Sequence, residues 1–161
     1  MPKALPWFSA SAAIVAVDQL VKWFFLSTFV PGERFEVTGF FNLVLVFNKG
    51  AAFSFLSDAP GWQTPVLAAV AIVAAAVISV LILKNGDKRL FCGGLALILG
   101  GALGNLVDRL RFGHVVDFLD LHALGWHWPA FNVADSAITV GAVVLILEGF
   151  LHREKPPAAA A

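Results

Sequence analysis

The stretch Pro65–Leu83, PVLAAVAIVAAAVISVLIL, contains nineteen residues and no charge. At about 1.5 Å per residue, a helix of this length spans roughly 28 Å, close to the thickness of the hydrocarbon core of a bilayer. A second apolar stretch, Leu90–Val107, follows after the short segment KNGDKR. This segment carries Lys84, Lys88 and Arg89, so the positive-inside rule places it in the cytoplasm. The sequence therefore predicts two transmembrane helices joined on the cytoplasmic side.

The composition agrees with a small multi-pass membrane protein. Of the 161 residues, 59% are hydrophobic and 14% are charged, whereas soluble domains are about half apolar and a quarter charged. The 11 basic and 11 acidic side chains balance, which argues against a nucleic-acid partner. One cysteine excludes a disulfide framework and the usual zinc cluster of four ligands. We expect residues 1–161 to form a single integral-membrane domain.

Two shorter apolar stretches flank this central pair, and each needs charged residues to reach the length of a span. The first, at 5–17, must continue through Asp18 and Lys22. The second, at 136–147, must begin earlier and include Asp135. Four spans place both termini in the cytoplasm. The predicted spans are about 6–29, 65–83, 90–108 and 131–150, and the tail at 154–161 is expected to be disordered.

Two outer loops are long enough to carry structure of their own. The first, about 30–63, contains turn signals at Thr38-Gly39 and Asn48-Lys49-Gly50, which predict two or three short strands on the membrane surface. A sheet that faces lipid, or a lipid-bearing substrate, would use its phenylalanines: Phe35, Phe40, Phe41, Phe47, Phe53 and Phe55. The second loop, about 110–130, is expected to form a short interfacial strand or helix, with Trp126 and Trp128 in the headgroup region.

Charged residues on three of the predicted helices converge near the outer face. Asp18, Asp108 and Asp135 lie there, and intramembrane charges indicate a functional site by default. Asp18 and Lys22 are four residues apart, so they can also form an internal ion pair. Asp108 and Arg109 are expected to form a second charge-compensating pair. Small residues on one face of the third helix, Gly93, Gly100 and Gly104, predict close helix packing.

Asp117 and Asp135 could form a catalytic pair. Two neighbouring carboxyl groups share a proton, so one can act as a base and the other as an acid. The structural alternatives remain open: Asp135 can cap a helix, and Asp117 can be a solvated loop charge. Asp120 is a weaker candidate because it points in a different direction.

Other chemistries find less support. Asp117, Asp120, His122 and His127 have metal-ligand side chains, but no H-E-x-x-H motif is present and the two histidines are five residues apart. A cysteine nucleophile is disfavoured because Cys92 lies at the cytoplasmic end of its helix, far from the histidines. We expect no metal and no cofactor.

Five motifs in order resemble the lipoprotein signal peptidases, the bacterial type II signal peptidase family. They are DQLVK from Asp18, NKGAAFS from Asn48, GNLVDR from Gly104, VVDF from Val115 and FNVAD from Phe131. The resemblance implies a membrane protein with an all-α core of four transmembrane helices, a small extracytoplasmic β-cradle and an outer-loop interfacial helix. It also implies an aspartyl protease of the bacterial inner membrane. Such an enzyme cuts diacylglyceryl-modified prolipoproteins just before the lipidated cysteine, at the outer face.

The same resemblance implies roles for individual residues. Asp117 and Asp135 would be catalytic, without a covalent intermediate or a metal. The residues implied to bind substrate or support the dyad are Asn48, Arg109 and Asn132, and those implied to support the site's architecture are Asp18, Lys22, Gly50, Asn105 and Asp108. The expected partners are the prolipoprotein substrates and membrane lipid, with no nucleic acid, and the protein is expected to be a monomer.

Two rival functions are weighed against this interpretation. A presenilin-like intramembrane protease would show a G-x-G-D motif, which this sequence lacks. A small transporter or channel would need charges distributed through the depth of the membrane. Here the charges cluster at one face, which favours an enzyme site open to that face.

Overall fold

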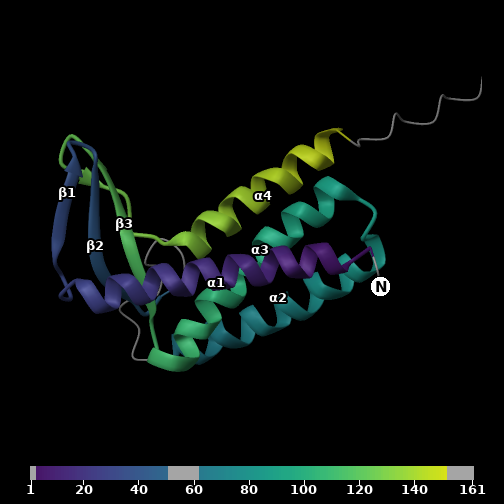
Figure 1. Ribbon diagram of the computed structural model, residues 1–161, viewed down its shortest axis with the longest axis horizontal. Coiled ribbons are helices and arrows are strands. Elements are labelled where there is room, and N and C mark those ends of the chain that lie inside the picture. Colours follow the sequence, from purple (N-terminus) through teal and green to yellow (C-terminus); the bar gives the residue numbers. More distant parts are fainter. Residues whose placement is uncertain (1–2, 51–61, 152–161) are drawn as a thin grey trace, which may run out of the picture.

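The computed structural model describes residues 3–50 and 62–151. It contains four helices long and apolar enough to cross a membrane, as the sequence predicts. They are α1 (Leu5–Thr28), α2 (Gln63–Asn85), α3 (Arg89–Phe112) and α4 (Val133–Leu151), shown in Figure 1. Helix α3 continues past the predicted end at 108 and stops at Gly113, whose φ of 75° provides a left-handed C-cap. The predicted tail at 154–161, together with Phe53 and Phe55, lies outside the described residues.

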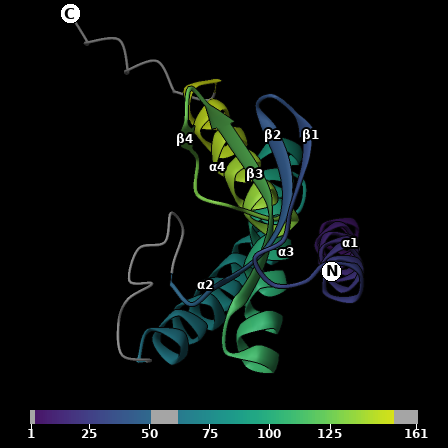
Figure 2. The ribbon, with the colours of Figure 1, turned by 90° about the vertical axis from the view of Figure 1, so that its left-hand side faces the viewer.

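Helix α3 is the central helix, against which α1, α2 and α4 each pack. The view along the bundle in Figure 2 shows the other three helices around it. Its glycines make this possible on two faces. Toward α1, a Cβ on Gly100 would lie 2.7 Å from Ile14 Cβ. Toward α4, a Cβ on Gly94 would lie 2.9 Å from Leu145.

The sequence analysis predicted close helix packing on only one of these two glycine faces. Gly100 and Gly104 do pack against α1, but Gly93 has room for a Cβ, whose nearest neighbour would be a Trp7 atom 3.8 Å away. The face toward α4 was not predicted. On that face, Gly101 contacts the backbone of Ala134 at the start of α4. The close approach at Gly101 therefore fixes α4 against α3 near its first turn.

A four-stranded antiparallel sheet lies at one end of the bundle, beside the end of α1 (Figure 1). Its order is β1 (Arg34–Thr38), β2 (Phe41–Asn48), β3 (Val115–Ala123) and β4 (Trp126–His127). The first two strands come from the first outer loop, as predicted. Of the two alternatives for the segment 110–130, the strand is correct, and the described part of this segment contains no interfacial helix. Val115 and Val116 favour a strand, and β2 offers an edge to pair with.

An aromatic core fixes the sheet to α1. Phe25 stacks on Phe118 of β3 with ring centroids 4.4 Å apart, and Leu45 and Val116 complete the buried cluster. Burying these side chains removes apolar surface from water at the base of the sheet. Strand β3 is thereby held between α1 and β2.

Candidate active site

A buried ion cluster joins α1 to α3 below the sheet. Lys22 Nζ lies 2.8 Å from Asp18 Oδ2 and 2.8 Å from Asp108 Oδ2, and all three side chains are buried. The predicted Asp18–Lys22 pair is confirmed. The predicted Asp108–Arg109 pair is wrong, because neighbours on a helix point about 100° apart and Asp108 faces α1. One lysine thus lies between two carboxylates, as buried charges require.

The same carboxylates fix the start of β3 and α4. Asp18 Oδ1 accepts a hydrogen bond from the backbone N–H of Ala134 at 2.9 Å, and Asp108 Oδ2 accepts one from Val116 at 3.1 Å. Gln19 Nε2 donates to Asp108 Oδ1 at 2.8 Å. The sequence analysis missed Gln19, whose one signal was its place beside Asp18 in the first motif. The ion cluster therefore determines where the next two elements begin.

Asn132 and Asp135 form a capping box at the start of α4. Asn132 Oδ1 accepts from the Asp135 backbone N–H at 2.9 Å, and Asp135 Oδ2 accepts from the Asn132 backbone N–H at 3.3 Å. Asp135 therefore caps α4 through Oδ2, which confirms the structural alternative for this oxygen. The other oxygen, Oδ1, accepts from Asn105 Nδ2 of α3 at 2.7 Å. Asp135 therefore caps its helix and also faces the interior of the site.

Asp117 is the third residue of β3 and is 2% exposed, so it is not a solvated loop charge. Asn132 Nδ2 donates to its Oδ1 at 2.6 Å and Asn48 Nδ2 donates to its Oδ2 at 3.1 Å. Burial and the nearby charge of Asp135 raise the pKa of Asp117 to about 7, against the opposing effect of these two hydrogen bonds. Asp117 can therefore gain or lose a proton near neutral pH.

The side-chain amide of Asn132 links the two carboxyl groups. Its Nδ2 group donates to Asp117, while its Oδ1 accepts from the backbone of Asp135. The same Nδ2 also lies 3.2 Å from Asn105 Oδ1, and that oxygen accepts from Lys22 Nζ at 2.9 Å. Polar residues from each of the five motifs thus form one network that runs from the ion cluster to the carboxyl pair.

Arg109 extends this network toward the first outer loop. Its Nη2 donates to the carbonyl oxygen of Gly50 at 3.1 Å, and the Gly50 N–H donates to Asn48 Oδ1 at 2.9 Å. The Nε of Arg109 is buried and has no hydrogen-bond partner within residues 3–50 and 62–151. The guanidinium therefore keeps a donor that a bound molecule could use.

The four residues weighed as metal ligands do not form one cluster: His122 stacks on His127 with ring centroids 4.9 Å apart, but Asp117 lies elsewhere. Asp120 and His127 are in contact, with His127 Nδ1 2.8 Å from Asp120 Oδ1, whereas Asp117 belongs to the asparagine network. Burial alone would raise the pKa of Asp120, but hydrogen bonds with Asn42 and His127 hold it below its usual value. Residues three apart on a strand point to opposite faces, which separates the two aspartates.

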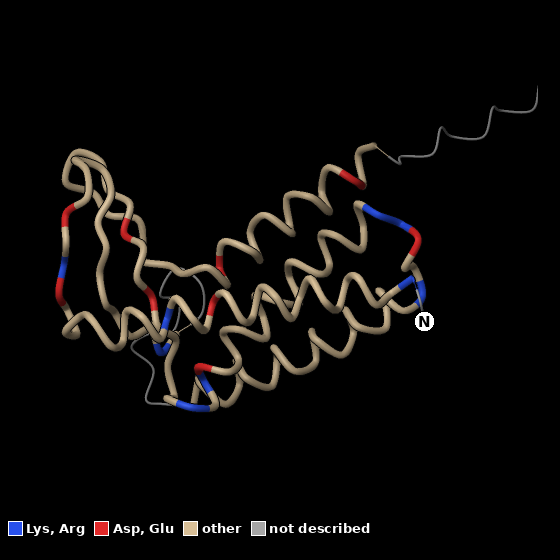
Figure 3. The backbone as a smooth tube through the Cα atoms, in the orientation of Figure 1, with Lys and Arg blue, Asp and Glu red and all other residues tan. Residues whose placement is uncertain are grey.

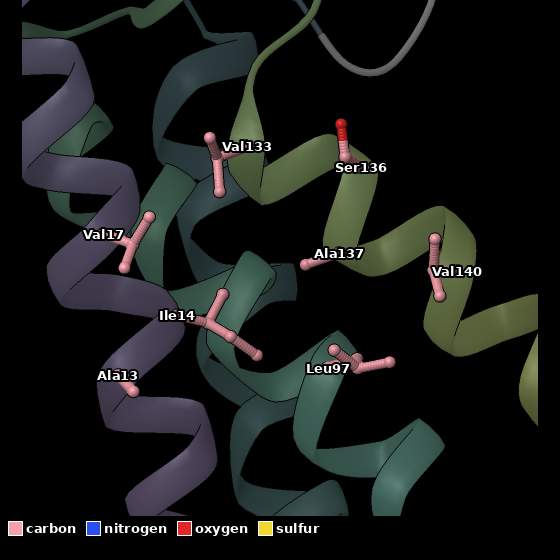
Figure 4. Close-up of a pocket in the computed structure, with 8 residues that line it drawn as sticks. All are labelled: Ala13, Ile14, Val17, Leu97, Val133, Ser136, Ala137 and Val140. Atoms are coloured by element: carbon pink, nitrogen blue, oxygen red, sulfur yellow. The ribbon is translucent and has the colours of Figure 1, made fainter.

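An apolar groove runs between α1 and α4, above α3 (Figure 4). Its volume is about 370 Å³, and it opens to the side of the bundle. Val133 and Ser136 line its end and flank Asp135 in the first turn of α4. The other lining residues are Ala13, Ile14, Val17, Leu97, Ala137 and Val140. Neither Asp117 nor Asp135 lines the groove, so an apolar ligand there would lie beside the first turn of α4 without contacting the carboxyl pair directly.

Comparisons with known proteins agree over most of the chain. The model of the family described as signal peptidase (SPase) II matches residues 10–151. The lipoprotein signal peptidase of Paraburkholderia phytofirmans is 56% identical over 143 residues, which cover 89% of this chain and 83% of the relative. The lipoprotein signal peptidase of a Janthinobacterium species is 56% identical over 144 residues, which cover 89% and 87%.

Two solved structures share the fold. Both are described as a bacterial membrane enzyme crystallised by the in meso method, at 2.3 Å and 1.9 Å resolution. The first has a TM-score of 0.80 at 27% identity and covers 95% of this chain and 94% of its own. The second has a TM-score of 0.79 at 29% identity and covers 93% and 94%.

Proposed function

The chain belongs to the signal peptidase II family, and from this premise we propose that the carboxyl groups of Asp117 and Asp135 catalyse its reaction. It is a bacterial membrane protease that removes the signal peptide of prolipoproteins. The transporter alternative is not favoured, because relatives at 56% identity are lipoprotein signal peptidases. The observation that carries the dyad is the shared Asn132, which hydrogen-bonds to both aspartates.

The proposed mechanism is direct attack by water. The pKa of Asp117, raised to about 7 by burial and by the charge of Asp135, lets one proton be shared by the pair near neutral pH. The ionised carboxylate takes a proton from water, and the resulting nucleophile attacks the scissile carbonyl carbon. The protonated partner polarises the carbonyl oxygen and then supplies a proton to the leaving amine. The carboxyl pair returns to its starting state with one proton.

Neutral amides would hold the dyad in place for this reaction. Asn48, Asn105 and Asn132 each donate to a carboxylate oxygen and bring no charge with them. The buried Nε of Arg109 would donate to a backbone carbonyl of the substrate, which suits the forked guanidinium. Its Nη2 contact with the Gly50 carbonyl fixes the guanidinium in that position.

We further propose that the termini are cytoplasmic and that the site lies at the outer face of the inner membrane. Lys84, Lys88 and Arg89 lie around the turn between α2 and α3, and Lys3 lies just before α1. This turn and the start of α1 are at the end of the bundle opposite the sheet, where Figure 3 shows basic residues. The positive-inside rule assigns that end to the cytoplasm. The dyad then meets water at the outer interface, while apolar parts of the substrate remain in the bilayer.

The substrate proposed for this site is a prolipoprotein whose cysteine carries diacylglyceryl. The apolar groove between α1 and α4 reaches the first turn of α4, so acyl chains in the bilayer can lie beside the dyad. The exposed side chains of Trp126 and Phe40 at the far end of the sheet would contact lipid headgroups. One chain supplies both carboxyl groups, so a monomer suffices.

The test is cleavage of a diacylglyceryl-modified prolipoprotein peptide by the purified protein in detergent. We expect cleavage just before the cysteine, loss of cleavage when the peptide lacks its lipid, and loss in Asp117→Asn and Asp135→Asn. Asp87→Asn, in the exposed turn between α2 and α3, is the matched control and should cleave at the wild-type rate. Wild-type rates in either dyad variant would contradict the assignment of that residue.

A further inference from the structure

A second buried aspartate of β3, Asp120, contacts all three of the other strands. Its Oδ2 accepts from Asn42 Nδ2 of β2 at 2.8 Å and lies 3.7 Å from Arg34 Nε of β1. Its Oδ1 lies 2.8 Å from His127 Nδ1 of β4. Asp120 is 4% exposed, although it lies in a sheet outside the helical bundle. One carboxylate thus joins the four strands near the middle of the sheet.

The Asn42–Asp120 bond lies beside an irregularity in the pairing of β2 with β3. Asn42 pairs with Asp120 and Leu43 with Leu119, but the next pair is Val46 with Asp117. Strand β2 therefore has one more residue than β3 in this interval, as in a β-bulge. The Asn42–Asp120 bond holds the strands on one side of the bulge, and the Asn48–Asp117 bond holds them on the other.

The pairing register at this point determines the position of both proposed catalytic residues. A slip by one residue would turn Asp117 to the opposite face of the sheet. The backbone of Leu119 also exchanges two hydrogen bonds with Phe131, at 2.9 and 3.0 Å. Phe131 directly precedes Asn132, the first residue of the capping box. A shift of β3 would therefore move the start of α4 as well.

We infer that Asp120 and Asn42 form a register clamp that positions the dyad, an inference that rests on the proposed function. A buried carboxylate is a weak source of stability, since an apolar residue would fill the same space without a desolvation cost. Its value is specificity, because an amide and a carboxylate pair in the correct register and leave unsatisfied groups in any other. Asp120 is thus a positioning residue, and it acts on the reaction through β3.

Three variants test the clamp through its chemistry. Asn42→Asp places two carboxylates opposite each other and should lower kcat by about tenfold or more, with KM within about twofold, because small displacements of catalytic groups are costly. Asp120→Asn keeps a hydrogen bond between two amides and should lower kcat less. The double variant Asn42→Asp/Asp120→Asn restores a carboxylate–amide pair with reversed polarity, and kcat should return to within about threefold of the wild type.

The pH profile of kcat separates positioning from a general loss of stability. In Asn42→Asp, the part of the pH profile that reports the ionisation of Asp117 should shift along the pH axis. The reason is that Asp117 moves relative to Asn48 and Asn132. Glu36→Gln, an exposed residue of β1 opposite Asn42, is the control and should change neither kcat nor the profile. The unfolding temperature of each variant, measured in the same detergent, identifies variants that fail to fold.

Two results would overturn the clamp. One is a folded Asn42→Asp protein with wild-type kcat and an unchanged pH profile. The other is a folded double variant that stays as slow as Asn42→Asp. Neither result tests the proposed dyad, which is tested separately by Asp117→Asn and Asp135→Asn.

Discussion

Two groups of carboxylates lie next to each other in this molecule and are built in opposite ways. In the ion cluster, Lys22 lies 2.8 Å from both Asp18 and Asp108. In the proposed dyad, Asp117 and Asp135 receive hydrogen bonds from neutral asparagines, and no ion pair reaches either carboxylate within the described ranges. A nearby cation stabilises the ionised form of a carboxylate, whereas amide donors around two neighbouring acids leave a proton available. The ion cluster is therefore suited to holding the helices together, and the asparagine-bound pair is suited to proton transfer.

The largest expected effect comes from removing an acid of the dyad. Asp117→Asn and Asp135→Asn should each lower kcat by about a thousandfold or more, because a positioned acid or base contributes about 10² to 10⁴ in rate. Their unfolding temperatures should stay near that of the wild type, because asparagine keeps the shape of the side chain. Cleavage assays and thermal unfolding in the same detergent measure both effects. If both variants unfolded, the two carboxyl groups would be structural, like those of the ion cluster.

The next effect comes from the cation of the ion cluster. Lys22→Met leaves Asp18 and Asp108 buried without their partner, which should cost about 3 to 5 kcal/mol of unfolding free energy. Denaturant unfolding in micelles measures this cost. Lys84→Met, in the exposed last turn of α2, should cost almost nothing. Equal stability of the two variants would remove the distinction between the two carboxylate groups.

A smaller effect should follow from crowding the ion cluster without touching its charges. A Cβ on Gly104 would lie 2.7 Å from Asp18 Oδ2, so Gly104→Ala should displace Asp18 and cost about 1 to 3 kcal/mol. Gly149 in α4 has open space around it, and Gly149→Ala should be neutral or stabilising. Unfolding of both variants under one set of conditions makes the comparison. A neutral Gly104→Ala would mean that the ion cluster tolerates displacement.

The last expected effect is a dependence of stability on pH that comes from Asp117. The pKa of this carboxyl is raised from 3.8 to about 7, so the folded protein binds a proton there that the unfolded chain releases. This contribution is complete below about pH 4 and is lost as the pH rises through 7. Asp117→Asn should flatten the dependence of unfolding temperature on pH in this range. An unchanged curve in the variant would assign the dependence to another group.

Features that depend on local sequence could be predicted, and those that depend on distant pairing could not. Apolar stretches predicted the four helices, and four-residue spacing predicted the Asp18–Lys22 pair. The burial of Asp117 depends on β3 pairing with β2, and its hydrogen bond to Asn48 joins residues 69 apart in sequence. The Asp108–Arg109 prediction failed because adjacent residues of a helix point in different directions. The role of Asn132 as the link between both acids depends on β3 lying beside the start of α4, which joins residues 15 apart in sequence.

The shared lysine of the ion cluster also bears on how the chain enters the membrane. Asp108 lies near the C-terminal end of α3, and a lone aspartate in a helix opposes insertion by about 2.5 to 3.5 kcal/mol when it lies at the centre. Its partner, Lys22, belongs to α1, which is synthesised more than sixty residues earlier. Packing of α1 against α3 therefore gives Asp108 the cation that α3 does not carry on the same face. The cost of holding this carboxylate in the membrane is then lowered by a helix that comes earlier in the chain.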